Sequence, residues 1–287
     1  MVSISVITPS LNQGHFIDDA ILSVAGQDYP NIEHIVVDGG SCDETSHILT
    51  LYPHLRWISE PDEGQSDAIN KGFRMASGDL VGWLNADDYY LPGALKAVGE
   101  FAERNPDADI IYGNSIHVDK SGNLIRLKIE HEFDFHVLLY YGCYIDSNAV
   151  FIRNRVVHQQ LLLDTHYRVS MDYEYFVRLA ALGKTYRHLD RMLAAFRWHG
   201  SNNSLQENKR RSERLNIQSG WSALQMNESG YDMLAKIFRA KHILLKMLNG
   251  SYSRQLKGSV FRPCPTRWFD SDVCKSVPVL TTSIFRT

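Results

Sequence analysis

The fold of this chain is decided by the stretch Gly82-Trp83-Leu84-Asn85-Ala86-Asp87-Asp88-Tyr89. An apolar run begins at Leu80 and leads, through this stretch, into the two adjacent carboxylates Asp87 and Asp88. A buried strand that ends in acids places charge at the carboxyl edge of its sheet, where open α/β sheets bind ligands. Adjacent carboxylates there favour a divalent cation that holds a diphosphate. The alternative is that one Asp caps a helix near Pro92, which accounts for one acid but not for two.

Alternating strand and helix patterns extend from this stretch toward both ends of the first hundred residues. Short β-branched runs alternate with helical stripes up to about Pro106, which predicts right-handed βαβ units and a mainly parallel sheet. The expected strands are 4–8, 32–38, 55–59 and 80–85, and the helical stripes are 16–24 and 68–76. The fold class is therefore α/β, with a Rossmann-like, mainly parallel twisted sheet.

The pattern changes after Pro106, where antiparallel additions to the sheet are expected. A turn at 119–123 separates short runs at 116–118 and 124–127, and further strands are expected at 110–112 and 149–152. A helix is predicted over 172–182, and 192–199 leads into a loop at 200–204. We place a boundary there, with one domain at 1–205 and a helical and loop-rich C-terminal extension at 206–287. The tail after Gly250 shows little periodicity and is expected to be loop-rich or partly disordered.

The composition excludes several classes of protein. The chain has 287 residues, of which 44% are hydrophobic and 22% charged, as in an ordinary globular protein. Its formal net charge of -3 gives no drive toward nucleic acid. The cysteines show no CxxC spacing, the first residues lack a signal-peptide pattern, and no apolar run approaches the roughly eighteen residues of a membrane span. These features predict a cytoplasmic protein that does not cross a bilayer.

Two other polar stretches follow strands of the same predicted sheet and should converge on the same edge. The first is 8–13, and the second is 37–41, in which Asp38 precedes two glycines. Glycines let the backbone approach a planar ligand, and Asp38 can accept hydrogen bonds from a base or ribose. The alternative is a tight turn with Ser41 or Asp43 capping a helix. The sequence leaves both hypotheses open.

A third polar stretch, 60–72, lies where a helix is expected to begin. Helix N-termini attract anions, and Lys71 could neutralise a phosphate. Because the stretch is rich in acids, we expect Asp67 to contact sugar or base rather than phosphate. The alternative is an exposed acidic loop with Lys71 on the solvated face.

Taken together, these stretches resemble the family 2 glycosyltransferases with the GT-A fold, of the bacterial surface-polysaccharide type. The resemblance covers Ser3 to about Ser204 and rests on five motifs in the right order. They are Val6-Ile7-Thr8-Pro9-Ser10-Leu11-Asn12, Val36-Val37-Asp38-Gly39-Gly40-Ser41, Gly64-Gln65-Ser66-Asp67-Ala68-Ile69-Asn70-Lys71-Gly72, Gly82-Trp83-Leu84-Asn85-Ala86-Asp87-Asp88 and Met171-Asp172-Tyr173-Glu174.

The resemblance implies a role for each matching residue. The base and ribose of a nucleotide donor would be held by Pro9, Ser10, Asn12 and Asp38, with Asp67 and Lys71 near the donor. Asp87 would ligate Mn²⁺ or Mg²⁺, Asp88 would assist or contact the sugar, and His199 would face metal or diphosphate. Asp172 would be the catalytic base. The chain departs from the family at Asn85, where an Asp is usual, and at Met171, where a Glu is common.

The implied activity is that of a metal-dependent, inverting glycosyltransferase of the hexosyltransferase type. It would move a sugar from a nucleotide donor, a UDP-sugar by expectation, to a hydroxyl of a saccharide or lipid-linked saccharide. One rival is a sugar nucleotidyltransferase, but residues 8–14 lack the basic phosphate loop it would need. Another is a non-catalytic nucleotide-binding or glycan-binding subunit. The departures at Asn85 and Met171 favour this alternative, whereas the presence of Asp87, Asp88 and Asp172 argues against it.

Residues 233–248 form a basic amphipathic helical pattern in the extension. Such a helix most often packs its apolar stripe on its own domain, and this is the hypothesis we favour. The alternative is peripheral contact with an anionic membrane surface, at the inner face, which would suit an enzyme that acts on lipid-linked glycans.

Overall fold

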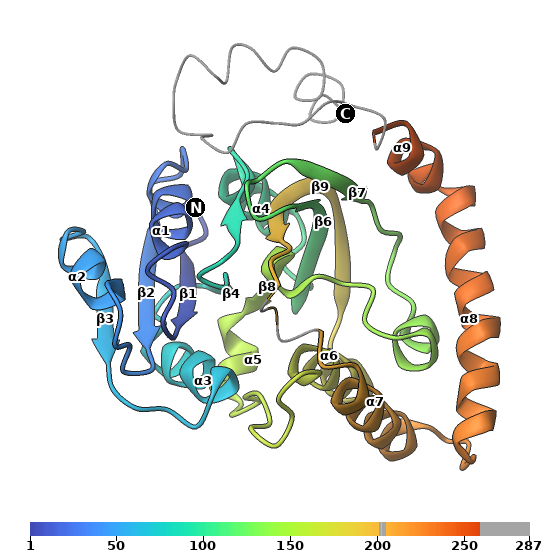
Figure 1. Ribbon diagram of the computed structural model, residues 1–287. Coiled ribbons are helices and arrows are strands. Elements are labelled where there is room, and N and C mark those ends of the chain that lie inside the picture. Colours follow the sequence, from blue (N-terminus) through green and yellow to red (C-terminus); the bar gives the residue numbers. More distant parts are fainter. Residues whose placement is uncertain (201, 203–204, 259–287) are drawn as a thin grey trace.

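A computed structural model describes residues 1–200, 202 and 205–258. These residues form one nine-stranded mixed sheet in the order β3-β2-β1-β4-β8-β6-β9-β5, with β7 paired to β6. In Figure 1 the chain runs from the blue α1–β3 region on the left to the orange extension on the right. The Pro-containing tail, Cys264, Cys274 and most of the loop expected at 200–204 lie outside the described residues.

The first half of the sheet is parallel, which confirms the prediction. It consists of β1 (Ile4–Ser10), β2 (Ile32–Asp38), β3 (Arg56–Ser59) and β4 (Leu80–Trp83). Strand β1 lies in the middle and pairs in parallel with both β2 and β4. The connections contain α1 (Ile17–Ala25), α2 (Thr45–Thr50) and α3 (Gln65–Met75). All these strands therefore present their carboxyl ends to one edge.

Close packing between α3 and β1 fixes this half of the core. A Cβ atom at Gly72 would lie 2.2 Å from Ile7 Cγ2, so the helix approaches the strand as closely as only glycine permits. Trp83, fully buried on β4, stacks on Phe176 with ring centroids 5.8 Å apart. The end of β4 is thereby held firmly where the chain turns into the acidic segment.

The second half of the sheet contains the expected antiparallel additions and one parallel pair that was not predicted. Its elements are β5 (Tyr89–Tyr90), α4 (Ala94–Arg104), β6 (Ile110–Val118), β7 (Leu124–Lys128), η1 (Val137–Tyr141), η2 (Ser147–Ala149), β8 (Val150–Arg153), α5 (Asn154–His158), α6 (Met171–Ala181) and β9 (Tyr186–Arg197). Strand β8 is antiparallel to β4 and β6, and β7 forms the predicted hairpin with β6. The two short runs expected at 110–112 and 116–118 are one strand, and it pairs in parallel with β9.

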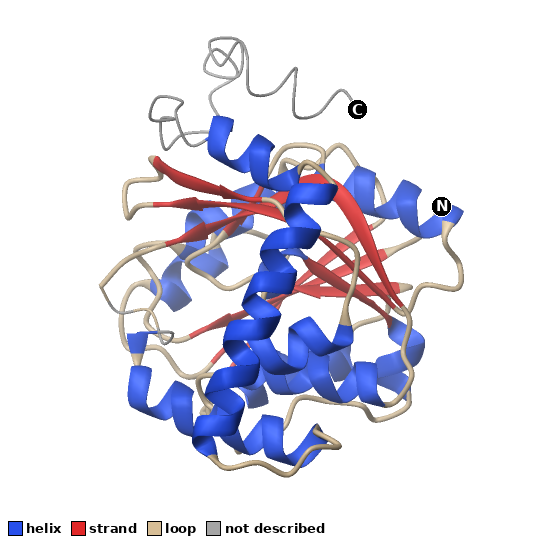
Figure 2. Cartoon of the chain, turned by 90° about the vertical axis from the view of Figure 1, so that its right-hand side faces the viewer, coloured by secondary structure: helices blue, strands red, loops and turns tan. Residues whose placement is uncertain are grey.

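The extension contains α7 (Glu207–Trp221), α8 (Glu228–Leu248) and α9 (Ser251–Gly258). The tail after Gly250 was expected to be loop-rich or partly disordered, but its first residues form α9, which follows a Gly250 in the left-handed region (φ 74°). Figure 2 shows α8 running the height of the molecule across one side of the sheet. Ile217 and Tyr231 belong to the same hydrophobic core as Trp83 and Phe176, so the extension packs directly on the first domain.

Helix α8 is apolar on two faces. Leu234, Phe238 and Leu245 pack against the core, as the favoured hypothesis predicts. A second stripe faces outward and consists of Met233, Ile237, Leu244, Met247 and Leu248, each more than half exposed. In the described part of the chain, every helix is too short or too polar to cross a membrane.

Candidate functional site

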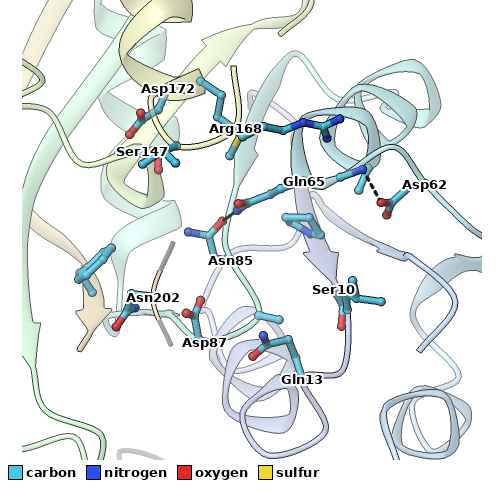
Figure 3. Close-up of a pocket in the computed structure, with 18 of the residues that line it drawn as sticks. Ser10, Gln13, Asp62, Gln65, Asn85, Asp87, Ser147, Arg168, Asp172 and Asn202 are labelled. Carbon is cyan, nitrogen blue, oxygen red and sulfur yellow. Dashed lines mark hydrogen bonds between the residues drawn. The ribbon is translucent and has the colours of Figure 1, made fainter. Parts of the chain in front are cut away.

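A pocket of about 420 Å³ opens at the carboxyl ends of β1 and β4 and extends to the start of α6. Figure 3 shows Asp87 and Asp172 on opposite sides of it. The residues of the prediction that line it are Pro9, Ser10, Asn85, Asp87, Asp172 and His199. Strand ends and loops from both halves of the sheet therefore meet at one site.

Asp87 and His199 are paired in this pocket. Asp87 Oδ2 lies 2.7 Å from His199 Nε2, and the Arg197 Nε–H donates to the Asp87 carbonyl over 2.9 Å. The His199 ring stacks on Phe16 with centroids 5.0 Å apart. These contacts draw the loop after β9 onto the turn after β4. The Asp87 carboxylate is a ligand that suits Mn²⁺ or Mg²⁺, so the residues present fit the metal that the resemblance implies.

Asp88 does not line the pocket. It is 1% exposed and accepts hydrogen bonds from the Arg197 backbone N–H, Asn148 Nδ2 and Asn85 Nδ2 over 2.9, 3.1 and 3.3 Å. Burial, and then the neighbouring Asp87 carboxylate, raise the pKa of Asp88 well above its usual range. In this geometry Asp88 holds the turn and the β9 loop together, and its contact with a sugar stays a prediction. Neither Asp caps a helix, because α4 begins at Ala94 after Gly93.

The geometry gives a physical reason for Asn85 in place of the usual Asp. Its amide nitrogen donates to Asp88, and its carbonyl oxygen accepts from Gln65 Nε2 over 2.7 Å. A carboxylate at this position would face the buried Asp88 carboxyl without a hydrogen to donate, which is unfavourable unless one of the two acids is protonated. Asn85 therefore makes hydrogen bonds to both Gln65 and Asp88 without adding a charge.

Asp172 is the second residue of α6, whose N-cap position is Ser170, so it does not cap the helix. Its Oδ1 accepts the Tyr173 backbone N–H over 2.7 Å. Burial raises the pKa of Asp172 to about 6, with a smaller contribution in the same direction from Asp146. A carboxylate with a pKa near the operating pH can take a proton from a hydroxyl effectively.

A buried polar network centred on Asp146 lies next to Asp172. Asp146 accepts hydrogen bonds from Ser115, His117 and Lys128. Although burial favours the neutral carboxyl, the Lys128 ammonium and His117 hold the pKa of Asp146 well below its usual range. The network therefore keeps a fixed ion pair near Asp172.

Asn12 and Asp38 organise the loops after β1 and β2 from outside the pocket lining. Asn12 adopts φ 53°, its N–H donates to Ser41 Oγ over 2.7 Å, and its side chain accepts from the Cys42 N–H over 2.9 Å. Asp38 is fully buried and accepts from the Ser41 N–H and Ser59 Oγ over 2.9 and 2.6 Å. The turn is tight, as the alternative hypothesis predicts, but neither Ser41 nor Asp43 caps the helix, because the N-cap residue of α2 is Glu44. A contact with base or ribose stays a prediction for both residues.

Asp67 and Lys71 pair with each other on α3 rather than lining the pocket. Lys71 Nζ lies 3.6 Å from Asp67 Oδ2 and 2.9 Å from Glu60 Oε1. The acids of the stretch thus hold the Lys71 ammonium, and the hydrogen bond from Glu60 raises the pKa of Lys71. The Lys71 side chain is 21% exposed, so it does not lie on a fully solvated face, and a contact of Asp67 or Lys71 with the donor stays a prediction.

Several lining residues were not predicted. They are Gln13, Asp62, Gln65, Ser147, Arg168 and Asn202. Gln65 binds Asn85, and Asn202 binds the backbone of His199 and Arg197. Most lie within the quoted motifs or beside them, so the sequence could have identified them as candidate site residues. Arg168 lies four residues before Asp172 in a segment without a pattern, and no sequence signal identifies it.

A second cluster of potential metal ligands lies away from this pocket. The described residues Glu130, His131 and His242 bring ligand atoms within 4.8 Å of one another, all buried. His131 Nε2 and His242 Nδ1 are already hydrogen bonded at 2.8 Å, and Lys246 Nζ lies 3.3 Å from Glu130 Oε1. The positive charge of the Lys246 ammonium disfavours the binding of a metal cation by these residues. We interpret the cluster as a polar network that fixes α8 to the end of β7.

The fold is shared with solved glycosyltransferase structures. Staphylococcus aureus TarS residues 1–349, in complex with UDP-GlcNAc, superposes with a TM-score of 0.64 at 18% identity, covering 86% of this chain and 74% of that one. The mannosyltransferase PcManGT from Pyrobaculum calidifontis, in complex with GDP-Man and Mn²⁺, gives 0.59 at 17% identity, covering 85% and 70%. These likenesses confirm the predicted α/β architecture as the GT-A fold.

The sequence comparisons define the family. Residues 5–165 match the model of glycosyl transferase family 2, and the chain belongs to that family. An uncharacterized glycosyltransferase of Nostoc sp., alr2836, is 29% identical over 219 residues, which are 71% of this chain and 67% of the relative. A PGL/p-HBAD biosynthesis glycosyltransferase of Mycobacterium bovis is 31% identical over 194 residues, 64% of this chain and 73% of the relative. The match to the Rickettsia conorii glycosyltransferase RC0461 spans only 21% of that relative.

Proposed function

We propose that this protein is a metal-dependent, inverting glycosyltransferase that moves a sugar from a nucleotide donor to a hydroxyl group. The donor is a UDP-sugar, and the acceptor is a saccharide or lipid-linked saccharide. The observation that carries the proposal is the placement of the Asp87–His199 pair and Asp172 on opposite sides of one pocket. Bacterial surface-polysaccharide assembly on the cytoplasmic side is the setting that we propose.

On the donor side, Asp87 and His199 would hold Mn²⁺ or Mg²⁺, with Pro9 and Ser10 beside the nucleotide. The ion, when bound, stabilises the negative charge of the departing nucleoside diphosphate. Because His199 Nε2 and Asp87 Oδ2 are hydrogen bonded to each other, this hydrogen bond would have to break or lengthen for both groups to bind the ion. The complexes of TarS with UDP-GlcNAc and of PcManGT with GDP-Man and Mn²⁺ support a nucleotide-sugar donor.

On the acceptor side, Asp172 would take the proton from the attacking hydroxyl. A base fixed across the pocket from the diphosphate directs the attack to the face of the anomeric carbon opposite the leaving group. One such displacement inverts the configuration at that carbon. The partly buried setting of Asp172 keeps bulk water from competing for the same position.

Peripheral membrane contact through residues 233–248 is also part of the proposal. The outward apolar stripe of α8 supports it, together with exposed Lys236 and Arg239 on the same helix. A helix of this kind can lie in the interface of an anionic membrane. The contact would bring the pocket close to a lipid-linked acceptor.

A panel of nucleotide sugars tests the proposed activity. The protein is incubated with each donor and Mn²⁺, and release of the free nucleoside diphosphate is measured with and without EDTA. We expect metal-dependent release from at least one UDP-sugar. Pyrophosphate formed from a nucleoside triphosphate and a sugar phosphate would instead identify a nucleotidyltransferase, and tight donor binding with neither release nor transfer would identify a binding subunit.

A further inference from the structure

Arg168 contributes a guanidinium to the lining of the pocket. Among the described residues that line the pocket, it is the one lysine or arginine. In the part of the chain that the structure describes, its guanidinium makes no hydrogen bond or ion pair, whereas Lys71 is held by Glu60 and Asp67. Figure 3 shows Arg168 reaching across from the Asp172 side toward Asp62 and Gln65. A free guanidinium over a cavity is suited to an anionic ligand.

The path of this side chain depends on a glycine. A Cβ atom at Gly64 would lie 2.2 Å from Arg168 Nη1, and Gly64 adopts φ 104°, which L side chains rarely adopt. The guanidinium therefore lies directly over the chain where α3 begins. A side chain at position 64 would therefore displace the Arg168 guanidinium.

The backbone that carries Arg168 is held from the C-terminal extension. Glu213 of α7 is 8% exposed, and its carboxylate accepts the backbone N–H groups of Arg168, Val169 and Ser170 over 2.9, 3.0 and 2.7 Å. Hydrogen bonds from a buried carboxylate to backbone N–H groups are strong and costly to lose. They fix the segment that leads directly into α6 and Asp172.

We infer that Arg168 binds the diphosphate of the nucleotide donor and that Glu213 of the extension is its positioning residue. The inference rests on the proposed function and adds two residues to it. An arginine offers a planar pair of N–H donors to phosphate oxygens, so it adds direction as well as charge to the attraction from a metal ion at Asp87. The extension then completes the donor site through Glu213, although none of its described residues lines the pocket.

Calorimetry with UDP and with uridine, both with Mn²⁺, tests the role of Arg168. We expect Arg168→Ala to weaken UDP binding by at least about tenfold, as loss of a charged hydrogen bond does, and to leave uridine binding unchanged. Arg168→Lys should restore part of the affinity, and Arg74→Ala, an exposed arginine of α3, should match the unaltered protein. Equal UDP affinity for Arg168→Ala would overturn the inference. If the unaltered protein bound no UDP, the proposed function itself would fail.

A double-mutant cycle tests the role of Glu213. If Glu213 acts through Arg168, Glu213→Ala weakens UDP binding, and adding it to Arg168→Ala weakens binding little further. Glu213→Gln keeps one carbonyl oxygen and should be intermediate, while Glu207→Ala, exposed on the same helix, should have no effect. Additive losses would show that Glu213 serves folding alone. Should Glu213→Ala fail to fold, the same cycle with Glu213→Gln decides the question.

Discussion

Asp172 must be ionised to accept a proton, so its pKa sets the lower pH limit of the proposed transfer. Burial raises that pKa to about 6. The carboxylate is the form present above this value, and kcat/KM should therefore rise roughly tenfold per pH unit below about pH 6 and level off above it. A pH profile of transfer measures this dependence. A rate that falls as the pH rises through 6 would have the wrong sign for a base.

The matching substitution is Asp172→Asn, which keeps the shape of the side chain and removes the base. We expect a loss of transfer of about 10²–10⁴-fold. Nucleotide affinity should be unchanged, because Asp172 lies across the pocket from Asp87. Turnover retained at the normal rate would remove Asp172 from the mechanism.

Individual residues of the site were predictable from the sequence to different degrees. Asp87 and His199 could be expected at the pocket, because they follow strands whose ends share an edge. The inward orientation of Asp88 could not, since it depends on the Arg197 backbone and on Asn148, both distant in sequence. Arg168 and Glu213 belong to no motif. Their relation appears only when α7 packs beside α6.

At the scale of elements, periodicity predicted what local sequence controls. The helical stripes and β-branched runs of the first half gave α1, α3 and strand β2 close to their observed bounds. The pairs β6–β9 and β5–β9 join strands separated by long stretches of sequence, and no local pattern encodes such pairing. The short β5 carries only two residues, too few for any alternation to show.

The exposed stripe of α8 leads to a prediction about membranes. The full chain should cosediment with vesicles that contain anionic lipid, and less with zwitterionic ones, because each basic residue near an anionic surface adds about 1 kcal/mol. Replacing Ile237, Leu244 and Leu248 together by Ser should reduce binding at least about tenfold, since binding scales with the apolar area inserted.

The control is the pair Leu51→Ser and Leu182→Ser, which are exposed apolar residues on other helices or their ends. They should bind vesicles like the unaltered chain. Absence of cosedimentation, or binding that is unaffected by the α8 substitutions, would remove the membrane contact and leave the glycosyltransferase proposal intact.

At the scale of the whole molecule, one sheet gathers the site from distant parts of the chain. Asp87 follows β4, Asp172 stands on α6, and His199 follows β9, yet all three line one pocket. The shared core of Trp83, Phe176 and Ile217 joins both halves of the sheet and the extension. The division at residue 205 stays a prediction, but the Glu213 contacts mean that the segment after it supports the site directly.

We propose that Asp87, at the carboxyl edge of this sheet, would hold the cation that stabilises the donor diphosphate. Calorimetry of UDP binding with Mn²⁺ and with EDTA, for the unaltered protein and Asp87→Ala, tests it most directly. The control is Asp28→Ala, whose carboxylate is 95% exposed. We expect UDP binding to require Mn²⁺, to be lost in Asp87→Ala and to be retained in Asp28→Ala. Equal affinity for the unaltered protein and Asp87→Ala, with Mn²⁺ present, would contradict it.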